Sequence, residues 1–251
     1  MRFLLYNIRY AAGTGMHFNL PLPYSGYLKH TNDNFGKIVE FTKATDPDII
    51  GLVEVDSGSF RSEKSNQAEA IARELNQFHV YQSKYSHTSI ARRIPVMSKQ
   101  GNAILTNQEV ISQNVHYFKQ GVKRLVVELE LKDISIFLVH LSIKFRHRHY
   151  QLMDLYDMMK NIKKPVIVAG DFNAFWGDRE LQLFMAAANL KNANITGRPT
   201  YPSRGPHRQL DYILHTPEIK IIDFKIPDIR LSDHAPLVCD FEISDQDFPK
   251  S

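Results

Sequence analysis

Two short polar segments carry side chains that could do chemistry together. Ser232-Asp233-His234 precedes the apolar run 235–241, and Asp171-Phe172-Asn173 follows the apolar run 165–169. Polar side chains at the end of a buried strand are where α/β folds usually present their chemistry. Carboxylate, amide and imidazole groups together could move protons and stabilise charge during a reaction. Each segment alone could equally be a turn in which the aspartate bonds its own backbone.

Four more polar side chains stand at comparable places in the chain. Asn7 ends the apolar run 3–6, Glu54 ends the run 49–53, and His140 ends the run 136–139. Asp211 lies within the run 209–214. Taken singly, Asn7 could only cap a turn, Glu54 could be a surface carboxylate, and His140 could be a satisfied buried histidine. The recurrence over six β-like runs favours a shared site.

The sequence resembles the endonuclease/exonuclease/phosphatase superfamily, which includes deoxyribonuclease I, abasic-site endonucleases, neutral sphingomyelinases, inositol-polyphosphate 5-phosphatases and deadenylases. The order of the matching segments is that of the family, and they cover nearly the whole chain. Val53 departs from the pattern, since the family usually has glutamine there. The segments are Tyr6-Asn7-Ile8-Arg9, Leu52-Val53-Glu54-Val55-Asp56, Gly101-Asn102-Ala103-Ile104-Leu105, His140-Leu141, Gly170-Asp171-Phe172-Asn173, Leu210-Asp211-Tyr212 and Ser232-Asp233-His234-Ala235-Pro236.

The resemblance implies a site for Mg²⁺ or Mn²⁺. Glu54 would be the main ligand, and Asn7 and Asp233 would belong to the metal shell. Carboxylate oxygens suit Mg²⁺, which takes one or two protein carboxylates, keeps several waters and binds substrate phosphate.

The resemblance also implies the catalytic roles. Asp171 would orient or deprotonate the attacking water, and Asn173 would donate to a phosphoryl oxygen. Asp211 would fix the ring of His234, which would stabilise the developing charge, as carboxylate–histidine pairs do. His140 would be a second donor to the phosphate, and Asn7 could hold the phosphate instead of the metal shell.

The segment His147-Arg148-His149 invites a zinc interpretation. Residues two apart on a predicted helix do not share a face, so we expect no zinc site there. Arg148 could still reach a substrate phosphate. Phe175 and Trp176 could stack on a base or a lipid, or pack in the core.

The resemblance implies an α/β fold, a four-layer sandwich of two face-to-face, mostly antiparallel β-sheets flanked by helices, as in deoxyribonuclease I. The length predicts a single domain over residues 1–251. Apolar spacing predicts helices over 32–44, 65–77, 146–162 and 178–188, the last capped by Asp178. A hairpin is expected from strands over 122–131 and 133–141. Long irregular segments over 11–31, 84–100 and 196–208 are expected to border the substrate.

Composition limits the remaining possibilities. A net charge of +4 modestly favours an anionic substrate, and an evenly solvated basic surface explains it as well. No run approaches the roughly 20 apolar residues of a membrane span. The single cysteine, Cys239, cannot form an intramolecular disulfide. We expect a cytoplasmic monomer, with a removed leader peptide as the alternative.

The substrate class follows from what the chain lacks and resembles. No ladder of lysine and arginine appears, and the stretch 54–68 is similar to bacterial hydrolases of the superfamily and to proteins linked to remodelling of glycosylphosphatidylinositol lipids. The aromatic and proline-rich segment 18–27 could touch an apolar substrate. We therefore predict a phosphodiester with a lipid or small headgroup. A nuclease acting on DNA or RNA is one alternative, and a non-catalytic phosphate-binding module is another.

Overall fold

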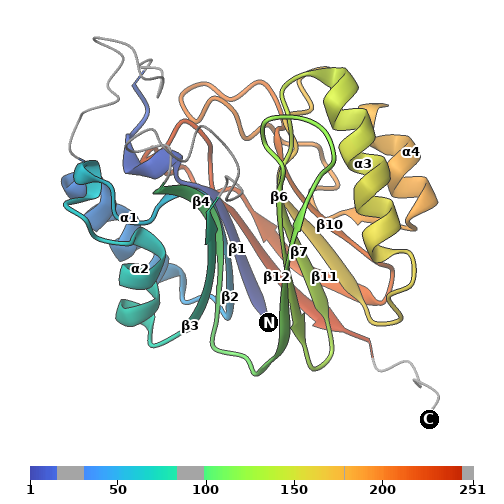
Figure 1. Cartoon of the computed structure of the whole chain (residues 1–251), viewed down its shortest axis with the longest axis horizontal. Coiled ribbons are helices and arrows are strands. Elements are labelled where there is room, and N and C mark those ends of the chain that lie inside the picture. The colour runs from blue at the N-terminus through green and yellow to red at the C-terminus, as the bar shows by residue number, and fades with distance from the viewer. Residues whose placement is uncertain (16–30, 84–98, 178, 245–251) are drawn as a thin grey trace.

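A computed structural model describes residues 1–15, 31–83, 99–177 and 179–244. Within these residues, two six-stranded sheets face each other, and a pair of helices covers the outer face of each sheet (Figure 1). The four-layer α/β sandwich expected from the sequence is confirmed, with both sheets mixed rather than purely antiparallel.

The first sheet has the strand order β11-β12-β1-β2-β4-β3, and the second has the order β5-β6-β7-β8-β10-β9. The strands are β1 (Arg2–Asn7), β2 (Ile49–Asp56), β3 (Phe78–Ser83), β4 (Gln100–Thr106), β5 (Val110–Tyr117), β6 (Leu125–Leu131), β7 (Ser135–His140), β8 (Val166–Asp171), β9 (Lys191–Asn192), β10 (Asp211–His215), β11 (Ile219–Lys225) and β12 (Leu237–Ile243). The helices are α1 (Asn32–Thr45), α2 (Gln67–Leu75), α3 (Phe145–Met159) and α4 (Arg179–Ala187), with short 3-10 turns at Arg9–Ala11 and Phe60–Ser62.

The central strands are apolar throughout because both of their faces are buried. In β1, Phe3 and Leu5 point into the core between the sheets, whereas Leu4 and Tyr6 pack beneath α1 and α2. Side chains alternate across a strand, so one short run serves two cores. The second sheet does the same with α3 and α4. This burial explains why the sequence shows short continuous apolar runs instead of alternation.

Each sheet contains one parallel pair of strands joined through a helix. β1 and β2 are parallel and are connected through α1, and β7 and β8 are parallel and are connected through α3. Parallel strands end at the same edge of a sheet. Gly51 in β2 lets the sheets approach closely, since a Cβ there would lie 3.0 Å from Leu138 Cδ1. The two edges that carry the strand-end polar residues therefore meet across the sandwich.

The predicted helix boundaries differ from the observed ones by at most three residues, for local reasons. The second helix begins at Gln67 because the Asn66 side chain caps it, accepting from the Ala68 and Glu69 backbone N–H groups. It ends at Leu75, since Asn76 adopts a left-handed backbone conformation. The predicted hairpin is present as β6 and β7. Asp178, residues 16–30 and residues 84–98 lie outside the described residues, so the expectations for them stay predictions.

Candidate active site

The strand ends gather the polar side chains at one edge of the sandwich. Asn7 ends β1 and His140 ends β7. Asp171 ends β8, opposite both His140 on β7 and Asp211 on β10. The antiparallel β10 starts where β8 ends, which is why Asp211 joins a group that otherwise sits at strand C-termini.

Asp171 is the centre of the site and is almost fully buried. Its Oδ2 accepts a hydrogen bond from Asn7 Nδ2 at 3.2 Å and lies 3.2 Å from His140 Nε2. Its Oδ1 accepts the backbone N–H of Asn173 at 2.9 Å. Asn173 has a left-handed φ of 50°, and its amide donates to the Leu141 carbonyl at 2.9 Å. One amide hydrogen of Asn173 thus fixes the loop, and the second can serve a substrate oxygen.

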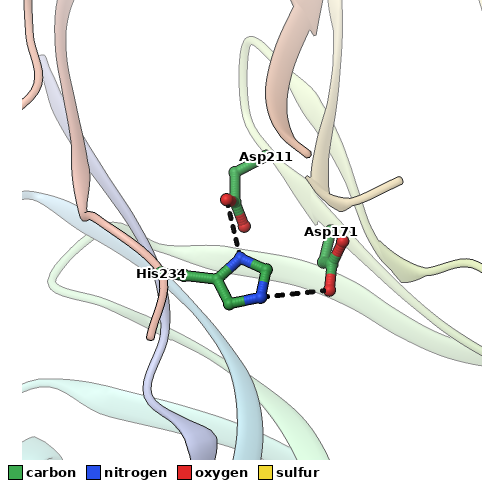
Figure 2. A group of neighbouring side chains, drawn as sticks. All are labelled: Asp171, Asp211 and His234. Atoms are coloured by element: carbon green, nitrogen blue, oxygen red, sulfur yellow. Dashed lines mark hydrogen bonds and ion pairs between the residues drawn. The ribbon is translucent and has the colours of Figure 1, made fainter. Parts of the chain in front are cut away.

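His234 lies between two carboxylates (Figure 2). Its Nδ1 is 2.8 Å from Asp211 Oδ2, and its Nε2 is 3.8 Å from Asp171 Oδ2. Thr200 Oγ1 donates to the same Asp211 oxygen at 2.6 Å. The Tyr201 ring packs beside the imidazole, with the ring centroids 4.9 Å apart. The predicted Asp211–His234 pair is therefore present, and Thr200 holds its carboxylate in place.

Neighbouring charges shift the pKa values of His234 and His140 in opposite directions. Burial alone lowers the pKa of His234, but the Asp211 and Asp171 carboxylates outweigh it and raise that pKa to about 10. Burial and the Lys123 ammonium lower the pKa of His140 to about 4. Burial raises the pKa of Asp171, but His234 and His140 outweigh it, so that pKa lies below its ordinary value. At neutral pH the site holds an imidazolium at 234, a neutral imidazole at 140 and a carboxylate at 171.

A bulge in β2 directs Glu54 into the site. The pairing of β2 with β4 shifts register between Leu52 and Val55, and Glu54 has a φ of 56°. Asn102, opposite the bulge, accepts the Glu54 backbone N–H at 3.3 Å. The Glu54 side chain keeps 18% of its surface exposed, and its Oε1 lies 3.9 Å from His140 Nε2. Asn102 belongs to a matching segment of the sequence, and the bulge gives it a structural role.

Lys123 is a member of the site that the sequence did not single out. Its Nζ contacts His140 Nε2 and lies 3.8 Å from Glu54 Oε1. The residue precedes β6 in a stretch without a recognisable motif, so only the folded chain brings it here. Thr200 was missed for the same reason, since eleven residues separate it from its partner Asp211.

Asp233 stands beside His234 and next to Arg9. Its Oδ2 lies 3.4 Å from Arg9 Nε, and Ser232 Oγ donates to its Oδ1 at 3.2 Å. Burial raises the pKa of Asp233, and the Glu54 carboxylate adds to the rise. Two neighbouring carboxylates at a partly exposed site favour a bound cation. The hard oxygen donors of this pair match the preference of Mg²⁺ and Mn²⁺.

A second acidic group could also hold a metal by distance alone. Asp171, Asp211 and His234 each offer a ligand atom, all within 4.8 Å of one another. Both nitrogens of His234, however, already face carboxylates. A proton on the imidazole lets it bridge the two carboxylates, whereas the side chains of Glu54 and Asp233 stay partly exposed, at 18% and 22%. The donor set therefore fits a divalent ion better on the Glu54 side of the site.

The expectation that Arg148 could reach a substrate phosphate is wrong, because its guanidinium is enclosed by the protein. The side chain is fully buried, and its Nε donates to Glu180 Oε2 at 2.8 Å. Its Nη1 donates to the carbonyls of Ser142 and Ile143 at 2.8 Å each. Arg148 thus ties α3 to α4 and to the loop after β7. The sequence could not show this buried role, since a basic residue beside two histidines is expected on a solvent-exposed helix face.

The loop over 196–208 borders the site as expected, and the aromatic pair after Asn173 lies beside it. Trp176 is 78% exposed, so the core interpretation is wrong for this residue. Phe175 packs edge-on against Tyr201, and the Arg208 guanidinium lies over the Phe175 ring, 5.5 Å from its centroid. Phe175, Trp176, His207 and Arg208 line a cavity of about 390 Å³.

Comparisons with known proteins find a matching family and relatives of similar sequence. The model of a family described as "Endonuclease/Exonuclease/phosphatase family" matches residues 4–234. The UPF0294 protein of Yersinia pestis is 33% identical over 114 residues, which are 45% of this chain and 43% of that protein. The chain thus spans less than half the length of this relative.

Solved structures share the fold. An endonuclease/exonuclease/phosphatase from Beutenbergia cavernae superposes with a TM-score of 0.73 at 18% identity, over 97% of this chain and 72% of that one. The catalytic domain of human Nocturnin, solved with a bound sulfate anion, gives a TM-score of 0.68 at 22% identity, over 97% and 94% of the two chains.

Proposed function

Because the chain belongs to the endonuclease/exonuclease/phosphatase family, we propose that it is a divalent-metal-dependent phosphodiesterase in which water attacks the phosphorus in line. The observation that carries the proposal is the imidazolium of His234, held between Asp211 and Asp171. A binding module has no need of a histidine whose pKa two carboxylates raise to about 10. Such a group serves to stabilise charge that develops during reaction.

Asp171 and Asn173 handle the attacking water and the phosphate. The lowered pKa of Asp171 keeps it ionised, so it can accept a hydrogen bond from the water and orient it. Asn7 and the Asn173 backbone hold the carboxylate from two directions. The second amide hydrogen of Asn173 donates to a phosphoryl oxygen. These contacts position the reacting atoms before any bond changes, which lowers the entropic cost of the step.

The opposite side of the site neutralises phosphoryl charge. Glu54, with Asp233 and the Asn7 amide nearby, would hold the metal ion, which supplies Lewis-acid stabilisation of the phosphoryl oxygens when bound. Lys123 adds a protein cation 3.8 Å from the Glu54 carboxylate. His140, whose Nε2 lies between Lys123 and Asp171, would donate to a phosphoryl oxygen or to the leaving oxygen when that nitrogen carries the ring proton.

The described basic side chains favour a small or lipid headgroup over a nucleic-acid backbone. Arg198 turns away from the site, since its guanidinium packs 5.8 Å from the Phe224 ring centroid and donates to the Phe224 carbonyl. Arg148 is buried. Among the basic residues described in the loop over 196–208, Arg208 lines the cavity next to the catalytic loop. Arg179 lines the same cavity, and two such cations suit a single phosphate or headgroup better than a repeating backbone.

A metal-dependence assay tests the proposal. Hydrolysis of bis(p-nitrophenyl) phosphate should appear with Mg²⁺ or Mn²⁺ and disappear with EDTA. Glu54→Gln should lower the metal-dependent rate at least about 100-fold, the usual scale for losing a charge-stabilising group. Circular dichroism should show an unchanged fold, and Glu69→Gln, an exposed carboxylate on α2, is the matched control. Equal rates in EDTA, or full activity of Glu54→Gln, would contradict the proposal.

A further inference from the structure

Four large apolar side chains are exposed at the edge of the sandwich that carries the candidate active site. We name this group the apolar rim: Ile143, Phe145, Trp176 and Leu183, which are 61%, 55%, 78% and 73% exposed. Ile143 and Phe145 stand where the chain enters α3, Trp176 precedes α4, and Leu183 lies on α4. The two helices lie side by side on the outer face of the second sheet (Figure 1).

Three of the four rim residues line two adjoining concavities. A groove of about 330 Å³ between α3 and α4 is lined by Phe145, Leu183 and Arg179, among others. Arg179 also lines the neighbouring cavity that contains Trp176. The shared residue places both concavities on the same face. Isolated exposed apolar side chains are ordinary, but a clustered set marks an interaction surface.

Cations alternate with the apolar side chains of the rim. Lys144 and Arg146 are exposed and flank Phe145, and Arg179 is exposed between the two concavities. In the part of the chain that the structure describes, no carboxylate forms an ion pair with any of these three residues. Among the described residues, this surface therefore presents apolar groups together with positive charge that no carboxylate pairs.

This combination matches the interface of a lipid bilayer. Apolar side chains enter the acyl boundary, tryptophan prefers the headgroup level, and lysine and arginine meet the phosphates of anionic lipids. A nucleic acid would use the cations and the indole but would leave aliphatic Ile143 and Leu183 in water. We propose that the apolar rim docks the protein on a phospholipid surface that carries anionic headgroups.

Docking by the rim would bring the catalytic edge to the headgroups. Ile143 follows His140 by three residues, and Trp176 follows Asn173 by three. Both loops therefore run from catalytic strand ends directly to the rim. That the substrate is a phosphodiester in a lipid headgroup rests on the proposed function. Docking on the lipid surface does not require that the protein hydrolyses anything.

Tryptophan fluorescence tests the docking directly, because Trp176 is the sole tryptophan of the chain. Glu54→Gln protein in EDTA, which prevents turnover, is titrated with vesicles of phosphatidylcholine alone or mixed with phosphatidylglycerol. The anionic vesicles should shift the emission to shorter wavelength and carry the protein upward in flotation. Ile143→Asp and Leu183→Asp should each weaken binding about tenfold or more, the scale expected for an apolar side chain that no longer enters lipid.

Ile111→Asp is the matched control. Ile111 is 54% exposed on β5, and its neighbour Val110 pairs with Leu131 at the sheet edge far from His140. This variant should bind vesicles as the parent does. The two rim variants should hydrolyse bis(p-nitrophenyl) phosphate at the wild-type rate, since neither side chain contacts the catalytic group.

Three results would overturn the docking proposal. They are an unchanged emission with anionic vesicles, rim variants that bind as tightly as Ile111→Asp, and a shift produced by duplex DNA but not by vesicles. Vesicle binding by a protein that hydrolyses no phosphodiester with Mg²⁺ or Mn²⁺ would instead reject the proposed function and keep the docking surface.

Discussion

Polar side chains from separate parts of the chain surround the Asp171 carboxylate. Asn7 and His140 lie about 3 Å from its Oδ2 and His234 lies 3.8 Å away, so one carboxylate joins strand ends of both sheets. A carboxylate in this position acts through all its partners at once. Its removal therefore changes the charge of the whole site and not one hydrogen bond alone.

Asp171→Asn and His234→Ala should each lower kcat about 10²–10⁴-fold, the range expected for acid–base and charge-stabilising groups. The double variant should lose much less than the product of the two effects, because both groups act on one transition state. Rates on an aryl phosphodiester give the measurement. Asp223→Asn, an exposed aspartate paired with Lys225, is the matched control and should keep full activity. Small, additive losses would place the chemistry elsewhere.

The raised pKa of His234 predicts how stability depends on pH. A folded-state pKa of about 10, above the ordinary value of 6.5, means that the imidazolium stabilises the folded state fully below about pH 6.5. This contribution is lost as the pH rises through about 10. Urea unfolding in EDTA between pH 6 and 10.5 should show stability falling across this window.

Asp211→Asn tests the cause of that fall. The variant removes the carboxylate bonded to Nδ1, so the pKa of His234 should drop, and the loss of stability should end at lower pH and be smaller. An identical pH profile for wild type and variant would show that the pair does not set the charge on His234.

At the scale of elements, the Arg148–Glu180 pair joins α3 to α4. Both side chains are nearly buried, and the guanidinium also satisfies two carbonyls of the loop after His140. Removing one partner of a buried ion pair leaves the other charge buried without a partner, which costs about 3–5 kcal/mol. Arg148→Met should therefore lower the free energy of unfolding by about that amount.

The double variant Arg148→Met/Glu180→Leu should recover part of the loss, since no charge is left unpaired. Chemical denaturation of the single and double variants gives the comparison. Lys43→Met on α1, from an exposed pair with Glu74, should change stability by less than about 1 kcal/mol. A similarly mild effect of Arg148→Met would refute the structural role of the pair.

The sequence predicts features that depend on neighbouring residues and misses those that depend on residues distant in the chain. Apolar runs with a polar end mark β1, β2, β7 and β8, because burial on both faces and the end of a strand are local properties. Lys123 meets Glu54 across the two sheets, and Thr200 meets Asp211 only when its loop folds back, so no local pattern marks either residue. The bulge at Glu54 and the burial of Arg148 depend equally on partners distant in sequence.

At the scale of the whole molecule, the net charge of +4 is small for a protein that follows a nucleic-acid backbone. Binding that neutralises Z phosphates of duplex DNA weakens with salt at a log–log slope of about −0.9Z. A single headgroup should therefore give a shallow slope. We expect kcat/KM on a glycerophosphodiester or a lysophospholipid to vary little between low and physiological salt.

Plasmid DNA and RNA are the comparison substrates in the same salt series. Cleavage of these alone, efficient at low salt and steeply reduced by added salt, would reject the headgroup substrate and favour a nuclease. Slow, salt-insensitive cleavage of nucleic acid beside faster headgroup hydrolysis would agree with the small-substrate prediction.

Because β1 pairs with β12, the first sheet cannot be completed until β12 has been synthesised. Arg2 in the first strand pairs with Asp240 in the last, and His234 arrives with that same strand. Until β12 emerges, one edge of β1 stays open, and an open strand edge can pair with a neighbouring chain. Nascent chains that stall before Leu237 should therefore aggregate, and activity should appear only after β12 has emerged.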